Sequence, residues 1–451
     1  MDIYMLGITT VIGGQYFCWN EGVNAGIYSF LFGYLLIASA YITFCCCTAE
    51  ITGALPFAGG AYGLARCTLG FYPAFIIGCC EALEYIAALV IQIKGGRAFW
   101  IFNLGIGTIS LMIVVIYCLG SFAFVNFGKY GADPNFEFVD GVSGFMKAFP
   151  LAAWFFVGVE ALNMSSDQVV QPKKVVPIAQ VSCVVTLFCT GLVIFFVTAS
   201  LPPGLATLPS ELVPFNRGFT LVFNISHHTA TILSLPATYA TAFGFMWCYG
   251  KLIAAMAMSR LLPHFLSKTT KENETPYGAF LAGSALSYAL CIISYFVPAV
   301  GDHLFRICVL SAFMSYTGQC IGYISLKRNY RNIKSSEFRS PWGIAGAAYS
   351  MVVWVLAIIA VVAFQDNGGI EIIVFSAIIV VLTVFYFGYS RKRQTFSAAE
   401  NRVMLVAHVT KLNIKKVAAG RRAKQKASGS SKCTGGEGTD TSQAKKAGST
   451  N

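Results

Sequence analysis

The chain has 451 residues, of which 56% are hydrophobic and only 12% are charged, and its mean hydropathy is +0.65. Soluble domains carry about 25% charged residues, so the composition excludes an ordinary soluble protein and predicts an all-α polytopic membrane protein. The net charge of +12 belongs to the end of the chain, because residues 391–451 hold 14 Lys/Arg against 3 Asp/Glu, whereas residues 1–390 hold 18 against 17. A nucleic-acid-binding fold is therefore not indicated.

Apolar segments fill the chain up to residue 390. A membrane-spanning helix needs about 20 apolar residues, and eleven segments approach or exceed that length. They cover residues 4–24, 28–54, 71–93, 98–123, 145–167, 178–200, 229–259, 278–298, 303–326, 344–364 and 371–390. We therefore predict a membrane domain over 1–390. Residues 391–451 form a basic, largely disordered cytoplasmic tail that contacts anionic lipid headgroups.

The first segment contains two adjacent glycines, Gly13 and Gly14, within the stretch Val11–Asn20. Glycine in a helix interior costs about 1 kcal/mol relative to alanine, and two together let the backbone unwind. Unwound backbone at membrane depth is tolerated where it is buried in protein or lines a cavity. Small residues also permit close packing of membrane helices, and the glycine pair by itself favours that alternative.

The loops carry their positive charge on alternate sides. The loops that we place in the cytoplasm by the positive-inside rule are rich in Lys/Arg, and the loops that we place outside are not. The first set is 172–174, 260–271, 327–339 and the tail, and the second is 124–144, 201–228 and 365–370.

The first third of the chain departs from this alternation. Three segments separate the 55–70 loop, which holds Arg66, from the cytoplasmic Lys173, although an even number is required. We interpret this parity as one membrane helix absent near residues 93–97. An inverted start of the chain is the alternative.

The fifth segment carries a carboxylate at mid-membrane depth. Glu160 follows Gly158, a second candidate break, and Trp154 precedes it by six residues. An ionisable residue inside a membrane segment is a functional candidate, although a protonated Glu160 bonded to a neighbouring helix is the alternative. Trp154 is interpreted either as a packing aromatic or as a lid over a cavity.

Two interrupted helices in one bundle are typical of transporters with a binding site at the midplane. The exposed amides of one broken helix attract an anionic group, and the carbonyls of the other accept from an ammonium. A zwitterion or an amino-alcohol fits such a site. This pairing shifts the balance at Gly13-Gly14 towards a break that contacts substrate.

Several stretches then resemble a known family in sequence and in order. They are GGQYFCWNEGVNAG (13–26), AEITGALPFAGGAYGLAR (49–66), EALEYI (81–86), AFPLAAWFFVGVEAL (148–162), QPKKVVP (171–177), YGKLIAAMAMSRLLPHFLSK (249–268) and FRSPWGIAGAA (338–348). The chain resembles amino acid permeases of the amino acid–polyamine–organocation superfamily, and most closely its ethanolamine permease branch.

The resemblance implies a fold of twelve helices, built from two inverted five-helix repeats and two further helices. It implies that the first and sixth family helices supply the substrate site. The residues carried over for substrate binding are Ile12, Gly13, Gly14, Gln15, Trp154, Gly158, Val159 and Glu160, and the gating or coupling candidates are Glu84, Tyr85, Glu160 and Arg66.

The chain departs from the family in ways that bear on activity. About forty residues that the family has between Tyr85 and Ala148 are missing, and they correspond to its fourth helix, in agreement with the parity argument. A gene model that lost exons or a truncated copy explains this difference. The coupling ion, H⁺ or Na⁺, is left open, because segment 98–123 lacks the lysine of some proton-driven relatives. Thr238 and Thr241 offer hydroxyls to a cation, with helix-capping or packing groups as the alternative.

The main prediction is a secondary transporter of the plasma membrane that moves amino acids or ethanolamine-like amines by alternating access. The alternative is a non-transporting or degenerate permease paralogue, such as a nutrient sensor. We expect no enzyme activity, no cofactor and no metal centre, because the sequence has no nucleotide-binding loop, metal-ligand cluster or nucleophile elbow.

Overall fold

The computed structural model describes residues 1–54, 60–84, 96–270, 275–329, 337–365 and 369–396. The chain divides into two compact units, Met1–Asn401 and Arg402–Asn451, and the second lies outside the described residues. The prediction of a disordered tail therefore remains a prediction.

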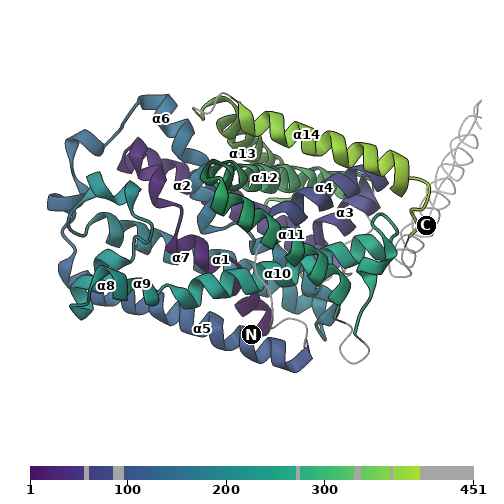
Figure 1. Ribbon diagram of the computed structural model, residues 1–451, viewed down its shortest axis with the longest axis horizontal. Helices are drawn as coiled ribbons and strands as arrows, with labels where there is room; N and C mark the ends of the chain where they lie inside the picture. Colours follow the sequence, from purple (N-terminus) through teal and green to yellow (C-terminus); the bar gives the residue numbers. More distant parts are fainter. Residues whose placement is uncertain (55–59, 85–95, 271–274, 330–336, 366–368, 397–451) are drawn as a thin grey trace, which may run out of the picture. The chain divides into compact units, whose positions relative to one another are not determined.

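The described part of the first unit is built from helices (Figure 1). The α-helices are α1 (Asp2–Tyr16), α2 (Ile27–Ala54), α3 (Gly60–Thr68), α4 (Phe71–Glu84), α5 (Gly96–Ser121), α6 (Gly141–Ala148), α7 (Pro172–Ala199), α8 (Asn216–Phe223), α9 (His227–Ile232), α10 (Leu235–Met258), α11 (Tyr277–Phe296), α12 (Pro298–Asn329), α13 (Gly343–Ala363) and α14 (Ile370–Phe385). Of the short 3₁₀ elements, η1 (Asn20–Ala25), η6 (Phe149–Phe155), η7 (Val159–Gln168) and η8 (Leu205–Ser210) bear on the site.

Nine helical spans among the described residues are long and apolar enough to cross a membrane. They are Ile27–Ala54, Arg97–Phe124, Gly141–Ser166, Pro172–Ala199, His227–Met258, Tyr277–Phe296, His303–Asn329, Gly343–Ala363 and Ile370–Ser390. A shorter apolar helix covers Phe71–Leu83, and α1 is 15 residues long. Each of the eleven predicted segments thus contains helix, and the prediction of an all-α polytopic membrane protein is confirmed.

Between α4 and α5 the chain has only residues 85–95. A spanning helix needs about 20 residues, so this connection is too short to contain a further one. The interval agrees with the predicted absence of a helix near 93–97. The residues of the interval themselves lie outside the described part.

Helix α1 lies in the middle of the bundle, in contact with α5, α7 and α10 (Figure 1). Twelve of its fifteen residues are buried. A helix that is apolar all round is expected in the interior of a protein, and α1 shows this pattern because its buried residues include Leu6 and Ile8, which lie on opposite faces. The surrounding helices expose many apolar side chains, as a lipid-facing surface requires.

The predicted unwinding at Gly13-Gly14 is wrong in this structure. Helix α1 continues through both glycines to Tyr16, and the backbone leaves the helix only at Phe17 and at Cys18, whose φ is +75°. The physical reason lies in α10. The hydroxyl of Thr241 accepts from the amide of Gly13 at 2.7 Å and donates to the carbonyl of Thr9 at 3.2 Å, so it bridges both ends of that helical turn.

The predicted break at Gly158 is confirmed. Its φ is +95°, a left-handed conformation that favours glycine, and it separates η6 from η7. The segment 145–167 was expected to be one membrane helix, but it is not a single α-helix. Only its beginning is α-helical, in α6, and the remainder is two 3₁₀ elements joined at this turn.

Candidate functional site

The two glycine-containing segments are in direct contact. A Cβ built on Gly14 would lie 1.9 Å from the carbonyl oxygen of Trp154 in η6. A Cβ on Gly158 would lie 2.6 Å from the ring of Phe245 and 3.0 Å from the methyl of Thr10 in α1. Glycine is thus required at both places for backbone to approach its neighbours, and the packing interpretation of Gly14 holds in this conformation.

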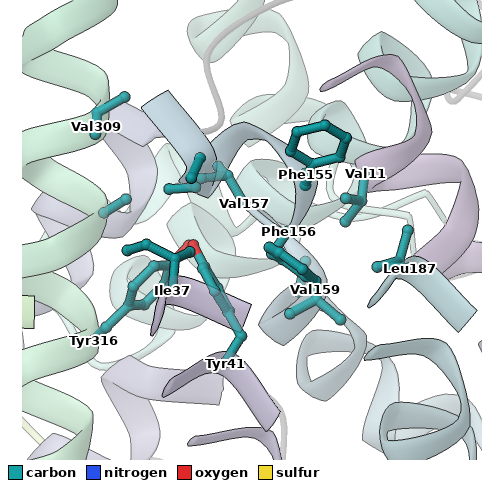
Figure 2. Close-up of a cluster of buried hydrophobic side chains, with 14 of the residues drawn as sticks. Val11, Ile37, Tyr41, Phe155, Phe156, Val157, Val159, Leu187, Val309 and Tyr316 are labelled. Atoms are coloured by element: carbon teal, nitrogen blue, oxygen red, sulfur yellow. The ribbon is translucent and has the colours of Figure 1, made fainter. Parts of the chain in front are cut away.

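Apolar side chains surround the contact. Figure 2 shows Val11 of α1 near Phe155, Phe156 and Val159, with Leu187 of α7 beside them. Ile12 and Val159 are completely buried. The region between the two segments is therefore tightly filled, as the interior of a folded protein normally is.

Two polar candidates are buried with these apolar groups. Gln15 is fully buried, and its amide donates to the carbonyl of Leu187 at 3.0 Å while its oxygen accepts from Thr190 at 3.0 Å. The side chain of Gln15 is thus directed at α7. Glu160 is 1% exposed, so its carboxyl lies inside the bundle at the start of η7.

The hydroxyls of Thr238 and Thr241 belong to helix-capping and packing contacts. Thr238 donates to the carbonyl of Ser234 one turn earlier in α10, at 3.1 Å. Thr241 spans the Thr9–Gly13 turn as described above. Both contacts agree with the alternative of helix-capping or packing groups at these positions.

Trp154 is half-buried and stacks on Phe305 of α12, with ring centroids 4.2 Å apart and planes inclined by 21°. Its indole N–H is buried and has no hydrogen-bond partner among the described residues. A buried donor without a partner is unfavourable. A movement of Trp154 that lets this N–H donate to a ligand or to water is therefore favoured by the hydrogen bond it forms. Phe305 also lines a small space that shares Glu21 and Arg306 with a larger charged cavity.

That cavity has a volume of about 260 Å³ and is lined by charged side chains. Glu21 of η1, Asp140, Lys147 of α6 and Arg306 of α12 all contribute to its wall. A smaller space of about 40 Å³, which shares Glu21 and Arg306, is lined by Phe305. The smaller space therefore places Phe305 next to the charged cavity, on the side that loop charge predicts to be external.

None of these cavity residues was among the predicted site residues. One signal was available, because Arg306 is a basic residue close to the predicted external end of segment 303–326, against the positive-inside rule. The contributions of Glu21 and Asp140 had no comparable signal. They depend on how η1 and the loop before α6 fold back over the bundle.

The segment after α1 is fastened to the loop before α8. The side-chain amide of Asn20 donates to the backbone carbonyls of Leu208 and Glu211, each at 2.8 Å. Buried Arg217 pairs with Glu211 at 2.7 Å. Burial raises the pKa of the Glu211 carboxyl, and Arg217 opposes that shift. These contacts hold η1, and with it Glu21, at one end of the bundle.

Arg66 lies in α3 with 2% exposure. Its guanidinium sits 3.9 Å from the ring centroid of Phe71 and 4.9 Å from that of Phe396. It donates to the hydroxyl of Tyr62 at 2.8 Å and to the backbone carbonyl of Thr395. Arg66, which was predicted to be a gating residue, thus binds the chain just after the last helix.

The other two gating candidates, Glu84 and Tyr85, lie at the end of α4 and just after it. Glu84 is the last residue of α4. Tyr85 lies outside the described residues. The roles of both residues remain predictions.

Comparisons with known proteins agree with this architecture. A family model described as amino acid permease matches residues 72–402. The chain is 26% identical over 447 aligned residues to the methylthioribose transporter of Bacillus subtilis (strain 168), covering 87% of this chain and 92% of that protein. It is 22% identical to the histidine permease HisP and to the lysine-specific permease LysP of Lactococcus lactis subsp. cremoris (strain MG1363), which cover 72% and 69% of the chain and are themselves covered over 72% and 65%.

Proposed function

The chain belongs to the amino acid permease family, and on this basis we propose that it is a secondary transporter that moves an amino acid or an ethanolamine-like amine by alternating access. The proposal extends to a location in the plasma membrane with the C-terminus in the cytoplasm, and to the inverted repeats of the superfamily. The observation that carries it is the direct contact between the Gly13-Gly14 turn and the broken segment at Gly158.

The substrate site in this proposal lies between those segments. The amide of Gly13 is occupied by the hydroxyl of Thr241 at 2.7 Å. A substrate carboxylate takes the place of that hydroxyl when the turn opens, because an anion accepts more strongly from an amide than a neutral hydroxyl does. The turn at Gly158, followed by Val159 and Glu160, faces the substrate amine.

The cavity supplies the outer entrance, with Trp154 and Phe305 as the barrier between it and the site. Opening this stacked pair exposes the site to the outer side. On the cytoplasmic side, Arg66 and its contacts with Thr395 and Phe396 hold the structure closed. Alternating access then consists of releasing one of these barriers at a time.

The names of the similar proteins point to two classes of solute. One similar protein is named for methylthioribose and two for amino acids. Purified protein reconstituted into liposomes should therefore be tested with labelled histidine, lysine, asparagine, ethanolamine and methylthioribose. We expect saturable uptake of an amino acid or of ethanolamine. Uptake of methylthioribose alone would overturn the assignment of an amine substrate.

Coupling is assigned to Glu160, the buried acid next to the break. Glu160→Gln should reduce uptake or remove its pH dependence while the folding yield stays unchanged, because glutamine keeps the shape and cannot exchange a proton. Glu137→Gln, at an exposed loop acid, is the matched control. Unchanged transport by Glu160→Gln at every pH would remove this residue from the site.

The second candidate function is a non-transporting paralogue that binds a nutrient without moving it. It is favoured by the short connection between α4 and α5, which has too few residues for a further spanning helix. Binding of a labelled amino acid without uptake, together with uptake by a version carrying a restored fourth helix, would support it. Uptake by the chain as it stands would exclude it.

A further inference from the structure

We propose that the outer cavity is a recognition site for zwitterions, in which Arg306 binds a carboxylate and Glu21 with Asp140 binds an ammonium group. This inference deepens the proposed transport function, since it selects α-amino acids over simple amines. It concerns binding at the entrance and not at the glycine segments.

The charge pattern of the cavity carries the argument. Its wall holds two acidic side chains, Glu21 and Asp140, and two basic ones, Lys147 and Arg306. A simple cation or a simple anion would meet one unfavourable pair of charges in this space. A zwitterion satisfies both signs, and a volume of about 260 Å³ is close to the lower limit of small-molecule sites.

Arg306 is fixed in position from behind. Its Nη1 lies 3.2 Å from Oε1 of Glu371, and the side chain of Glu371 is only 3% exposed. His303 approaches the same oxygen at 3.1 Å. The side chain of Arg306 is 26% exposed, and its guanidinium has five N–H donors in a planar fork, so one donor is anchored and others remain for a ligand carboxylate.

The acidic side of the cavity is anchored separately. Glu21 belongs to η1, which Asn20 fastens to the loop before α8 through the carbonyls of Leu208 and Glu211. Asp140 precedes α6 directly. Both carboxylates are on exposed residues, so they reach a ligand in solution before the aromatic pair opens.

The position beside the smaller space that Phe305 lines gives the site its use in the proposed transport path. A substrate held there already has its two charges paired when the stack opens towards the glycine segments. An amine without a carboxylate gains nothing from Arg306, and an acid without an amine gains nothing from Glu21. The cavity therefore acts as a filter for molecules that carry both groups.

The test uses a ligand too large to pass the aromatic pair. Lysine carrying an uncharged fluorophore on its side-chain nitrogen retains the α-ammonium and the α-carboxylate, and its binding to the purified full chain is followed by fluorescence anisotropy. The Nα-acetylated form lacks the ammonium, and the same dye on cadaverine lacks the carboxylate. We expect binding of the zwitterion and at least about tenfold weaker binding of both analogues.

Variants locate the site. Arg306→Gln and Glu21→Gln should each weaken binding of the zwitterionic ligand by about tenfold. Arg328→Gln, an exposed arginine at the other end of α12, should leave binding unchanged. Glu21→Gln serves if Arg306→Gln fails to fold, because Glu21 is exposed. Equal binding of the three ligands, or unchanged binding by both cavity variants, would overturn the proposal. Because this assay needs no transport, a failure of uptake is recognised independently.

Discussion

Gly14→Ala is the sharpest test of how α1 meets the Trp154 segment. The new Cβ would lie 1.9 Å from the carbonyl oxygen of Trp154, and because that oxygen belongs to the backbone, no change of rotamer relieves the clash. An extra methyl group in a well-packed core costs about 1–3 kcal/mol, whereas replacing a helical glycine by alanine returns about 0.5–1 kcal/mol. The difference lies between about 0 and 2.5 kcal/mol, and because the contact is with backbone we expect a loss in the upper half of this range in the free energy of unfolding.

The assay is thermal unfolding of the detergent-purified protein, with Gly105→Ala as the matched control. Gly105 lies in the exposed part of α5, and a Cβ there meets no atom within 4 Å. That variant should unfold at an equal or higher temperature than the wild type, and Gly14→Ala at a lower one. If Gly14→Ala is as stable as Gly105→Ala, the two segments do not approach as described and the site must be rebuilt.

Two further predictions concern contacts made by single side chains. Thr241→Val removes the hydroxyl that bridges Gly13 and Thr9 and should lower the free energy of unfolding by about 1 kcal/mol, measured by thermal unfolding. Thr241→Ser keeps the hydroxyl and should retain most of that stability. Equal stability of both variants would argue against the bridge. Arg66→Lys keeps the charge but loses the planar stacking and the forked donors, so trypsin should cleave faster after Arg391 and Arg393. Unaltered cleavage would mean that Arg66 does not hold the segment that follows α14.

Much of the fold was predictable because hydropathy is a local property. A chain whose apolar runs approach membrane thickness must satisfy its backbone groups within helices, and all eleven predicted segments contain helix. The break at Gly158 was also predictable. A positive φ is accessible to glycine without a steric penalty, and the break coincides with an acid that a continuous apolar helix would not carry.

The end of α1 was not predictable from the glycines. Two glycines weaken a helix by about 2 kcal/mol at most, a cost that one well-placed neighbour offsets. That neighbour is Thr241, 228 residues further along the chain. Because its hydroxyl spans the Thr9–Gly13 turn, the helix continues to Tyr16.

The sequence by itself therefore determined the class of protein, the positions of the membrane segments and the weak points of its backbone. Only the tertiary structure decided which weak point opens, and which charges share a space. Arg306, Glu21 and Asp140 line one cavity although they come from three separate elements, and Arg66 holds a carbonyl 329 residues away. The physical reason is that burial follows from local composition, whereas a hydrogen-bond or ion-pair partner is selected by packing between distant elements.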